Sequence, residues 1–445
     1  MGEAAAVDGA SSPRGTPPDR RGRFIAGLGV GQIVSWGTLY YSFPLIAEPM
    51  GRELGLTKPE VYGAATLGLI VASLAAYPVG AAIDRGRGRS VMVLGSAAAG
   101  LLLLAWSQVA GLRSLYPLFA GIGLVQAMTL YEPAFAVVAR RYGPADARRG
   151  ITALTLWGGF ASTVFVPLIQ VLLDGVGWRD TLATLGLINL ALCVALHLAV
   201  IDPRADAPRP APTSSTGAAA APLAGRRAVL WAARRPAFWG LLVAFTVYYG
   251  TFSALTFHLY PMLLERGFDA ATVVGVIAII GPAQVAGRIA VWLFAARRSI
   301  RAIGAAAVAA FPVALALLLF LPSGFASLAV FAVVYGAANG IMTIVRGLAV
   351  PEMLTRDAYG ALNGALAFPA TVAKALAPAG AALLWAYAGS YDALLVAALV
   401  GSIVVVAGFW LAALRFRDQA LPSATPAAPG ASVRAAAGPG APRSP

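Results

Sequence analysis

Twelve long apolar segments dominate this chain of 445 residues. A helix needs about 20 apolar residues to cross the hydrocarbon core of a bilayer, where no water satisfies open backbone groups. Hydrophobic residues make up 59% of the chain and charged residues 12%, which excludes a soluble multidomain protein. We predict an all-α polytopic membrane protein with twelve transmembrane helices, at residues 24–47, 60–83, 91–110, 115–139, 150–173, 181–200, 237–263, 272–295, 301–321, 325–350, 359–386 and 392–414.

Basic residues are distributed unevenly between the two sides of this topology. With the N-terminus inside, 25 of the 33 Lys and Arg residues fall on the inside and five on the outside. The positive-inside rule then predicts an N-in, C-in orientation. The net charge of +14 is explained by topology, so we expect no nucleic-acid partner. We expect a multi-pass protein of the plasma membrane, the bacterial inner membrane.

Polar segments rich in Pro, Ala and Arg divide the chain. The central one lacks apolar periodicity and separates the predicted helices into six and six. We expect five parts: a disordered cytoplasmic arm (1–23), an N-terminal six-helix bundle (24–201), a cytoplasmic linker (202–236), a C-terminal six-helix bundle (237–414) and a disordered cytoplasmic tail (415–445).

The two bundles carry traces of an internal repeat. Gly55–Gly63 matches Gly267–Gly275, and Ala127–Glu132 matches Ile341–Arg346 at nearly the same offset along the chain. Two repeats with the same orientation are related by an axis along the membrane normal, with substrate held between them near the midplane. The repeat therefore predicts alternating access.

The loop between the second and third predicted helices, from Gly80 to Arg89, reads Gly-Ala-Ala-Ile-Asp-Arg-Gly-Arg-Gly-Arg. It resembles the loop signature of the major facilitator superfamily, although the second glycine comes one residue later than usual. The resemblance covers about 24–414 and implies two pseudo-symmetric six-helix bundles, the major facilitator fold. It also implies a gating or coupling role for Gly80, Asp84, Arg85 and Arg89. We expect the small Gly80 to permit close helix packing.

Within that superfamily, the first predicted helix and the lone arginine of the eighth are most similar to the monocarboxylate and oxalate–formate exchanger branch. Residues 35–43 read Ser-Trp-Gly-Thr-Leu-Tyr-Tyr-Ser-Phe. The resemblance implies a small organic anion whose carboxylate pairs with Arg288, and a second cation at Lys374. The chain has Gln32 where proton-coupled members have a lysine, and Gln284 where they have an acid. These departures argue against proton coupling of that kind.

Four charged residues lie deep inside predicted helices: Glu132, Arg288, Arg346 and Lys374. A charge at the bilayer centre costs roughly 2.5–3.5 kcal/mol on insertion scales, so such side chains usually face a wet cavity, a partner or a substrate. The cations outnumber the acid, which points to an anionic ligand. The Arg288 fork can hold a carboxylate bidentately. A structural pair between Arg288 and Glu132 is the alternative.

Glu132 and Arg346 hold equivalent positions in the repeat with opposite charges. We interpret them as a compensating or gating pair. Glu132 as a proton carrier is the alternative, because a buried carboxylate binds a proton more readily. Arg288 and Lys374 are then the uncompensated cations expected to bind substrate. The uncharged candidates for the same site are Gln32, Trp36, Tyr40, Asn339 and Asn363.

These observations predict a secondary active transporter of a small organic anion, a mono- or dicarboxylate, working by alternating access. Proton-coupled efflux of drugs or other small molecules is the alternative. We expect no enzymatic activity, no cofactor and no metal, since the chain has one cysteine, Cys193, and no catalytic motif. A coupling proton or counter-anion, surrounding lipid and a monomeric state complete the expectation.

Overall fold

All regular elements of the computed structural model are helices, within the residues it describes: 18–203, 225–294, 298–320, 324–355 and 359–415. Ten helical stretches are long and apolar enough to cross a membrane, and one of them, Arg149–Val200, contains two predicted spans. The prediction of an all-α polytopic membrane protein is confirmed. The count of twelve crossings and the N-in, C-in orientation stay predictions. The predicted arm and tail, and most of the linker, lie outside the described residues.

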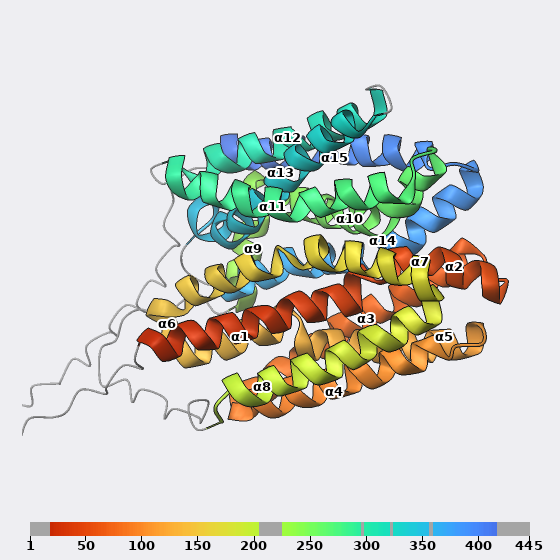
Figure 1. Ribbon diagram of the computed structural model, residues 1–445. Coiled ribbons are helices and arrows are strands. Elements are labelled where there is room, and N and C mark those ends of the chain that lie inside the picture. Colours follow the sequence, from red (N-terminus) through yellow and green to blue (C-terminus); the bar gives the residue numbers. More distant parts are fainter. Residues whose placement is uncertain (1–17, 204–224, 295–297, 321–323, 356–358, 416–445) are drawn as a thin grey trace, which may run out of the picture.

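The N-terminal half occupies the lower part of Figure 1, in red to yellow. A core around Trp106 and Phe119 holds it together. Its elements are α1 (Pro18–Trp36), the π-helical turn η1 (Gly37–Tyr41), α2 (Phe43–Leu54), α3 (Lys58–Ala82), the π-helical turn η2 (Ile83–Arg87), α4 (Gly88–Ser107), α5 (Leu112–Thr129), α6 (Tyr131–Gly158), α7 (Ala161–Ile188), the π-helical turn η3 (Asn189–Val194) and α8 (Ala195–Val200).

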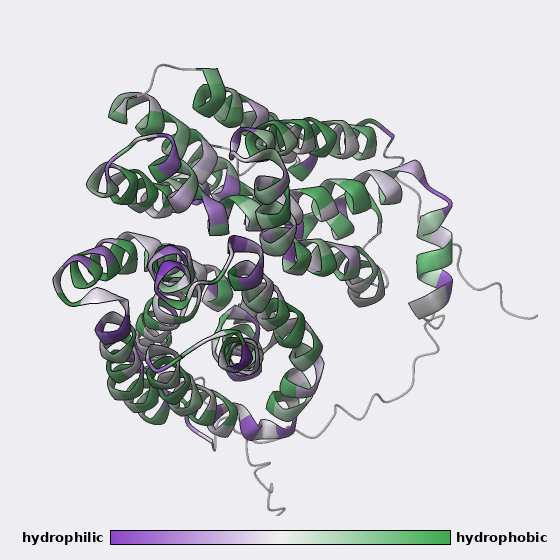
Figure 2. Cartoon of the chain, turned by 90° about the vertical axis from the view of Figure 1, so that its right-hand side faces the viewer, coloured by the Kyte–Doolittle hydropathy of each residue, from purple (hydrophilic) through white to green (hydrophobic). Residues whose placement is uncertain are grey.

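The C-terminal half fills the upper part of Figure 1 around a core that includes Phe331 and Phe409. Figure 2 shows hydrophobic residues over most of the helices, as a bilayer requires. The first element, α9, falls within the predicted linker. The elements are α9 (Gly225–Ala233), α10 (Pro236–Glu265), α11 (Ala270–Phe294), α12 (Ile300–Phe320), α13 (Phe325–Met353), α14 (Tyr359–Ala388) and α15 (Asp392–Leu414).

The backbone repeats itself at the offset found in the sequence. Gly55 and Gly267 have φ values of +65° and +88°, and Gly177 and Gly389 have φ values of +76° and +73°. The two pairs have the same separation along the chain, and only glycine adopts this left-handed conformation at little cost. The chain therefore turns at equivalent points in the two halves.

The helix caps that follow the first glycine pair also correspond. At the start of α3, the Thr57 backbone N–H donates to Glu60 Oε2 at 2.8 Å. At the equivalent position, the start of α11, the Thr272 backbone N–H donates to Asp269 Oδ1 at 2.9 Å. In both caps an acid and a threonine three residues apart satisfy open N–H groups, with their order exchanged. The two halves thus share a capping geometry although the residues at equivalent positions differ.

Two predicted spans are interrupted. The span predicted at 115–139 breaks at Leu130, which is extended (φ −79°, ψ −154°), and the one predicted at 150–173 breaks between α6 and α7. A side chain at Gly158 would meet the Tyr131 hydroxyl, so the two ends of α6 lie together and the helix is folded back on itself. Both predicted spans lie within helical stretches long and apolar enough to cross a membrane, Leu112–Tyr142 and Arg149–Val200, and the breaks inside them were not predicted.

Prolines inside the helices leave carbonyls without their usual donors, because proline has no N–H for the carbonyl four residues earlier. Pro133 leaves the Thr129 carbonyl without a backbone donor, and the Gln32 amide donates to this carbonyl at 2.8 Å. Pro378 leaves the Lys374 carbonyl without a backbone donor, and the Ser253 hydroxyl donates to this carbonyl at 2.8 Å. Side chains of neighbouring helices thus replace the missing backbone donors.

Two further carbonyls of this kind join the halves. Pro282 leaves the carbonyl of Ala278, which accepts from Thr163 of the other half at 2.9 Å. Pro261 leaves the carbonyl of Phe257, which accepts from the Tyr62 hydroxyl of the other half at 3.3 Å. Helix irregularities of the C-terminal half are thus contact points for the N-terminal half.

Candidate functional site

The two halves meet along α3 with α14, α7 with α11 and α2 with α10. At one end of this interface, Lys58 Nζ lies 3.0 Å from Glu48 of its own half and 3.7 Å from Glu265 of the other half. The same ammonium lies 3.7 Å above the centre of the Trp385 ring. We call this the closed end, since ion pairs and a cation–π contact join the halves here.

Two aromatic rings stack at the closed end, one helical turn along α3 from Lys58. Tyr62 of α3 stacks on His258 of α10, with ring centroids 4.0 Å apart. The His258 Nε2–H donates to the Pro378 carbonyl at 2.9 Å, and the Tyr391 hydroxyl lies 3.0 Å from Nδ1. A carbonyl can only accept, so this pattern places the proton on Nε2. The stack separates the centre of the interface from that end of the molecule.

Glu53 fixes the neighbouring loops of the N-terminal half. The Trp178 indole N–H donates to one carboxylate oxygen at 2.6 Å, and Arg179 lies 2.9 Å from the other. The Trp178 hydrogen bond, followed by that of Arg179, holds the pKa of Glu53 below its usual range. Glu265, its equivalent in the C-terminal half, accepts in the same way from the Trp385 indole at 2.7 Å.

Arg288 lies where the halves touch, on α11, with 7% of its surface exposed. Its Nη1 donates to the Thr155 carbonyl of α6 at 2.7 Å, and its Nε donates to the Gly340 carbonyl of α13 at 3.4 Å. Thr155 lies in the last turn of α6, where the helix dipole attracts a cation, and its carbonyl also accepts from the Gly159 N–H at 3.2 Å. Close packing of Gly281 on Gly159 brings the two halves together at this level.

Within the described residues Arg288 forms no ion pair. The alternative of a structural pair with Glu132 is therefore absent from this conformation. Tyr41, Tyr131 and Tyr248 are close enough to interact with the guanidinium electrostatically. Arg288 is thus a buried cation held by backbone carbonyls and surrounded by tyrosines.

Glu132, Arg346 and Lys374 form a second charged group. The negative charge of Glu132 acts on both Arg346 and Lys374, although within the described part of the chain no ion pair joins them. Arg346 donates to the Tyr249 hydroxyl at 2.8 Å, and Lys374 Nζ lies 5.9 Å from the Tyr40 ring centre. Sequence reasoning grouped Lys374 with Arg288, whereas its electrostatic partners are Glu132 and Arg346.

The break at Leu130 explains the position of Glu132. The break places Glu132 in the first turn of α6, where open N–H groups favour a carboxylate. Its side chain is exposed, while Pro133 and Ala134 beside it are buried. An exposed carboxylate between apolar neighbours indicates a surface that water reaches.

Aromatic rings separate the two charged groups. The Trp36 ring lies 5.1 Å from Tyr40 and 5.0 Å from Tyr131, and Tyr40 lies 5.1 Å from Phe257 of the other half. The Trp36 indole Nε1 is buried and, among the described residues, has no hydrogen-bond partner. Trp36 and Tyr40 therefore belong to one aromatic cluster that reaches Phe257 of the other half, and their role in substrate binding stays a prediction.

Three further residues were predicted to bind the substrate, and two of them are hydrogen-bonded within the protein. The Gln32 amide is occupied by Thr129, and Asn339 is occupied within its own half by Tyr248 at 2.8 Å and Tyr335 at 3.0 Å. Asn363 is half-buried on α14. In this conformation Gln32 and Asn339 bond to buried backbone and side-chain groups, and the assignment of Gln32, Asn339 and Asn363 to the substrate stays a prediction.

The loop motif forms η2 and lies far along the chain from these charges. A side chain at Gly80 would meet no atom within 4 Å, so close helix packing does not explain this glycine in the present conformation. Arg85 is exposed and Arg89 is half-exposed. The side chain of Asp84 lies outside the described residues. The motif's gating role stays a prediction.

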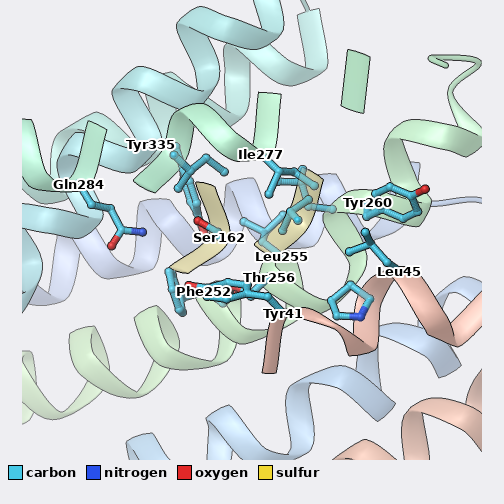
Figure 3. Close-up of a pocket in the computed structure, with 14 residues that line it drawn as sticks. Tyr41, Leu45, Ser162, Phe252, Leu255, Thr256, Tyr260, Ile277, Gln284 and Tyr335 are labelled. Carbon is cyan, nitrogen blue, oxygen red and sulfur yellow. The ribbon is translucent and has the colours of Figure 1, made fainter. Parts of the chain in front are cut away.

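A cavity between the halves, about 540 Å³ when the part open to solvent is included, was missed by sequence reasoning. Its lining comes from both halves (Figure 3): Tyr41, Pro44, Leu45, Ser162, Val166, Phe252, Leu255, Thr256, Leu259, Tyr260, Ile277, Ile280, Gln284 and Tyr335. The repeat could have identified one lining residue, because Phe252 corresponds to Tyr40 in the register that aligns Gly267 with Gly55.

Comparison with known proteins agrees with this architecture. A sequence model described as Major Facilitator Superfamily matches residues 28–319. Monocarboxylate transporter 11 of Homo sapiens is 33% identical over 267 residues, covering 57% of this chain and 51% of that protein. Its Mus musculus counterpart is 28% identical over 347 residues, covering 76% of this chain and 66% of that protein. The chain thus spans between half and two thirds of these relatives.

Solved structures share the fold. A bacterial homolog of the human lysosomal transporter Spinster, in an inward-facing and unoccupied conformation, has a TM-score of 0.68 at 13% identity, covering 90% of this chain and 98% of that one. The nucleoside transporter NupG has a TM-score of 0.63 at 14% identity, covering 90% of this chain and all of that one. At such low identity the similarity concerns the fold alone.

Proposed function

The chain belongs to the major facilitator superfamily, and from that premise we propose that it carries a small organic anion, a mono- or dicarboxylate, bound at Arg288. It is a multi-pass membrane transporter and not an enzyme. The similarity to proteins named monocarboxylate transporter 11 supports the choice of substrate.

The observation that carries the proposal is the coordination of Arg288. A guanidinium has five N–H donors in a planar fork. Here two neutral carbonyls accept from it, at 2.7 and 3.4 Å, and no carboxylate pairs with it among the described residues. A substrate carboxylate would replace weak neutral acceptors with a charge-assisted, bidentate pair. That gain offsets part of the desolvation of both charges.

The same contact links binding to movement of the halves. Arg288 belongs to the C-terminal half, and the Thr155 carbonyl that it contacts belongs to the N-terminal half. A carboxylate that takes the Thr155 position removes one tie between the halves. With the N-in orientation, the closed end faces outward, so the conformation described here is inward-facing. Substrate would then reach Arg288 from the side of Glu132.

The remaining charged residues complete the proposal. Glu132 reduces the repulsion between Arg346 and Lys374, which lie near the substrate path. The two bundles at 24–201 and 237–414 rock as units in a monomer, with the linker at 202–236 and both chain ends in the cytosol. A proton or a counter-anion supplies the driving gradient.

Transport in proteoliposomes tests Arg288. Arg288→Ala should lower exchange of labelled carboxylate by roughly 30-fold or more, because losing one partner of a buried charge pair costs about 2–5 kcal/mol. Arg288→Lys should recover part of the rate, since it keeps the charge and loses the fork. Arg113→Ala is the matched control, as this arginine is exposed at the start of α5. Equal rates in Arg288→Ala and the control would refute the assignment.

A second function, proton-coupled efflux of drugs or other small molecules, is favoured by one observation. Glu132 is exposed and, among the described residues, has no ion pair. A drug-resistance assay in cells distinguishes the two functions. Loss of resistance to lipophilic cations in Glu132→Gln, without carboxylate uptake by the parent protein, would favour efflux.

A further inference from the structure

The apolar cavity lies directly beside Arg288. Tyr41 both lines the cavity and interacts with the guanidinium. Gln284, also in the lining, precedes Arg288 by four residues on α11, which is one helical turn or about 6 Å. The guanidinium therefore lies next to two residues of the lining.

The lining has the character of a receptor for an apolar group. Its residues include no Asp, Glu, Lys, Arg or His, and aliphatic and aromatic side chains predominate. Leu255 and Phe252 come from α10, and Ile277 comes from α11. A second carboxylate placed among these side chains would lose its hydration without gaining a partner, which is strongly unfavourable.

The polar side chains of the cavity differ in how far they are already hydrogen-bonded. Figure 3 shows Gln284 and Tyr260 at opposite ends, with Leu255 and Ile277 between them. The Tyr260 hydroxyl donates to Gln170 at 2.6 Å and is therefore occupied. The Gln284 amide makes no hydrogen bond within the described residues, so it is available beside the guanidinium. The Gln284 amide, one helical turn from Arg288, can thus donate to a carboxylate, and the Tyr335 hydroxyl, which also lacks a hydrogen-bond partner among the described residues, is a second donor in the lining.

We propose, as a refinement that rests on the proposed function, that the transported anion has a single carboxylate and a bulky apolar body, best an aromatic ring. The carboxylate binds Arg288 and the Gln284 amide, and the body fills the cavity between the two halves. Tyr41, Phe252 and Tyr335 present aromatic faces and edges to the body, a preferred environment for a ring. Dicarboxylates and very short acids are excluded as good substrates.

Uptake of three labelled acids into proteoliposomes tests this selectivity. 3-Phenylpropionate should show a KM at least tenfold below those of acetate and succinate, because the ring alone gains from the cavity. Ile277→Trp fills the cavity and should remove this advantage while acetate uptake persists. Leu255→Ala enlarges it and should admit a naphthyl acid that the parent excludes. Ile403→Trp is the matched control, as Ile403 is 53% exposed on α15.

The outcomes separate the two proposals. Arg288-dependent uptake with succinate as good a substrate as 3-phenylpropionate would overturn the single-carboxylate inference and leave the anion site standing. Equal loss of all three acids in Ile277→Trp, with normal folding and a normal control, would show that the cavity does not hold the body. No uptake of any acid would overturn the proposed function itself.

Discussion

The Ser253 hydroxyl donates to the Lys374 carbonyl at 2.8 Å, across the contact between α10 and α14. The bond supplies the donor that Pro378 withholds from the helix. It fixes the backbone from which Lys374 reaches toward Tyr40, so the position of a buried cation depends on a serine of another helix.

Removing this hydroxyl should destabilise the protein. Ser253→Ala leaves a buried carbonyl without a donor, which costs about 1–3 kcal/mol. In a Pro378→Ala background the helix supplies its own N–H, and the same substitution should cost less than about 1 kcal/mol. Equilibrium unfolding in detergent measures both. Ser402→Ala is the control, because that hydroxyl bonds within its own helix. If Ser253→Ala lowered the free energy of unfolding equally in both backgrounds, the explanation would be contradicted.

Neutralising Lys58 should open the closed end. The ion pairs and the cation–π contact are partly exposed, so together they contribute about 1–2 kcal/mol. This is roughly a 5–30-fold change in the population of the closed end relative to the open one. Lys58→Met should therefore lengthen the distance between spin labels at Ser114 and Phe325, both exposed near that end, in a Cys193→Ala background. Lys58→Arg keeps the charge and should resemble the parent. An unchanged distance distribution in Lys58→Met would exclude a locking role.

Glu132 and Arg346 should compensate each other. Glu132→Gln leaves two cations close together without an acid and should lower anion exchange about tenfold. Adding Arg346→Gln restores the charge balance and should recover most of that loss, as coupled neighbouring residues do. Exchange in proteoliposomes measures both variants. The proton-carrier alternative predicts another pattern: Glu132→Gln would lose pH-driven accumulation, retain exchange, and gain nothing from Arg346→Gln.

Lowering the pH should remove the stabilisation that the Glu53 carboxylate provides. Its folded pKa is lowered by the Trp178 hydrogen bond, then by Arg179. The stabilisation is therefore complete above the unfolded pKa of about 4.3 and disappears as the pH falls through the lower folded value. Thermal unfolding of the parent and Glu53→Gln should differ at pH 7 and converge below that range. A difference that persists unchanged in acid would show that the charge of Glu53 is not involved.

Much of the architecture was predictable because it depends on local sequence. Segment length and hydropathy identified the helices, and the offset between Gly55 and Gly267 identified equivalent turns. The break at Leu130 was not predicted, because Pro133 is followed by apolar residues that resemble a continuous span. Its consequence for Glu132 depends on the folded backbone.

The charged residues near the site could be identified from the sequence, but the hydrogen-bond partners of the polar residues could not. Arg288 and Glu132 stand out because a charge inside apolar sequence is costly. Gln32 and Asn339 resemble ligand donors in sequence, and only the packing shows that a carbonyl or a tyrosine occupies them. The cavity beside Gln284 is built from apolar residues of several helices, each ordinary in its own helix.

The proline-freed carbonyls have a consequence for how such a chain changes over generations. Pro282 and Thr163 lie in different halves, yet the loss of either leaves the other with no reason to persist. Loss of Pro261 would likewise remove the need for the Tyr62 hydroxyl, although the Tyr62 ring would still stack on His258. Substitutions at these positions should therefore occur in pairs among homologous chains, and paired substitution would mark where two ancestral copies adapted to one another.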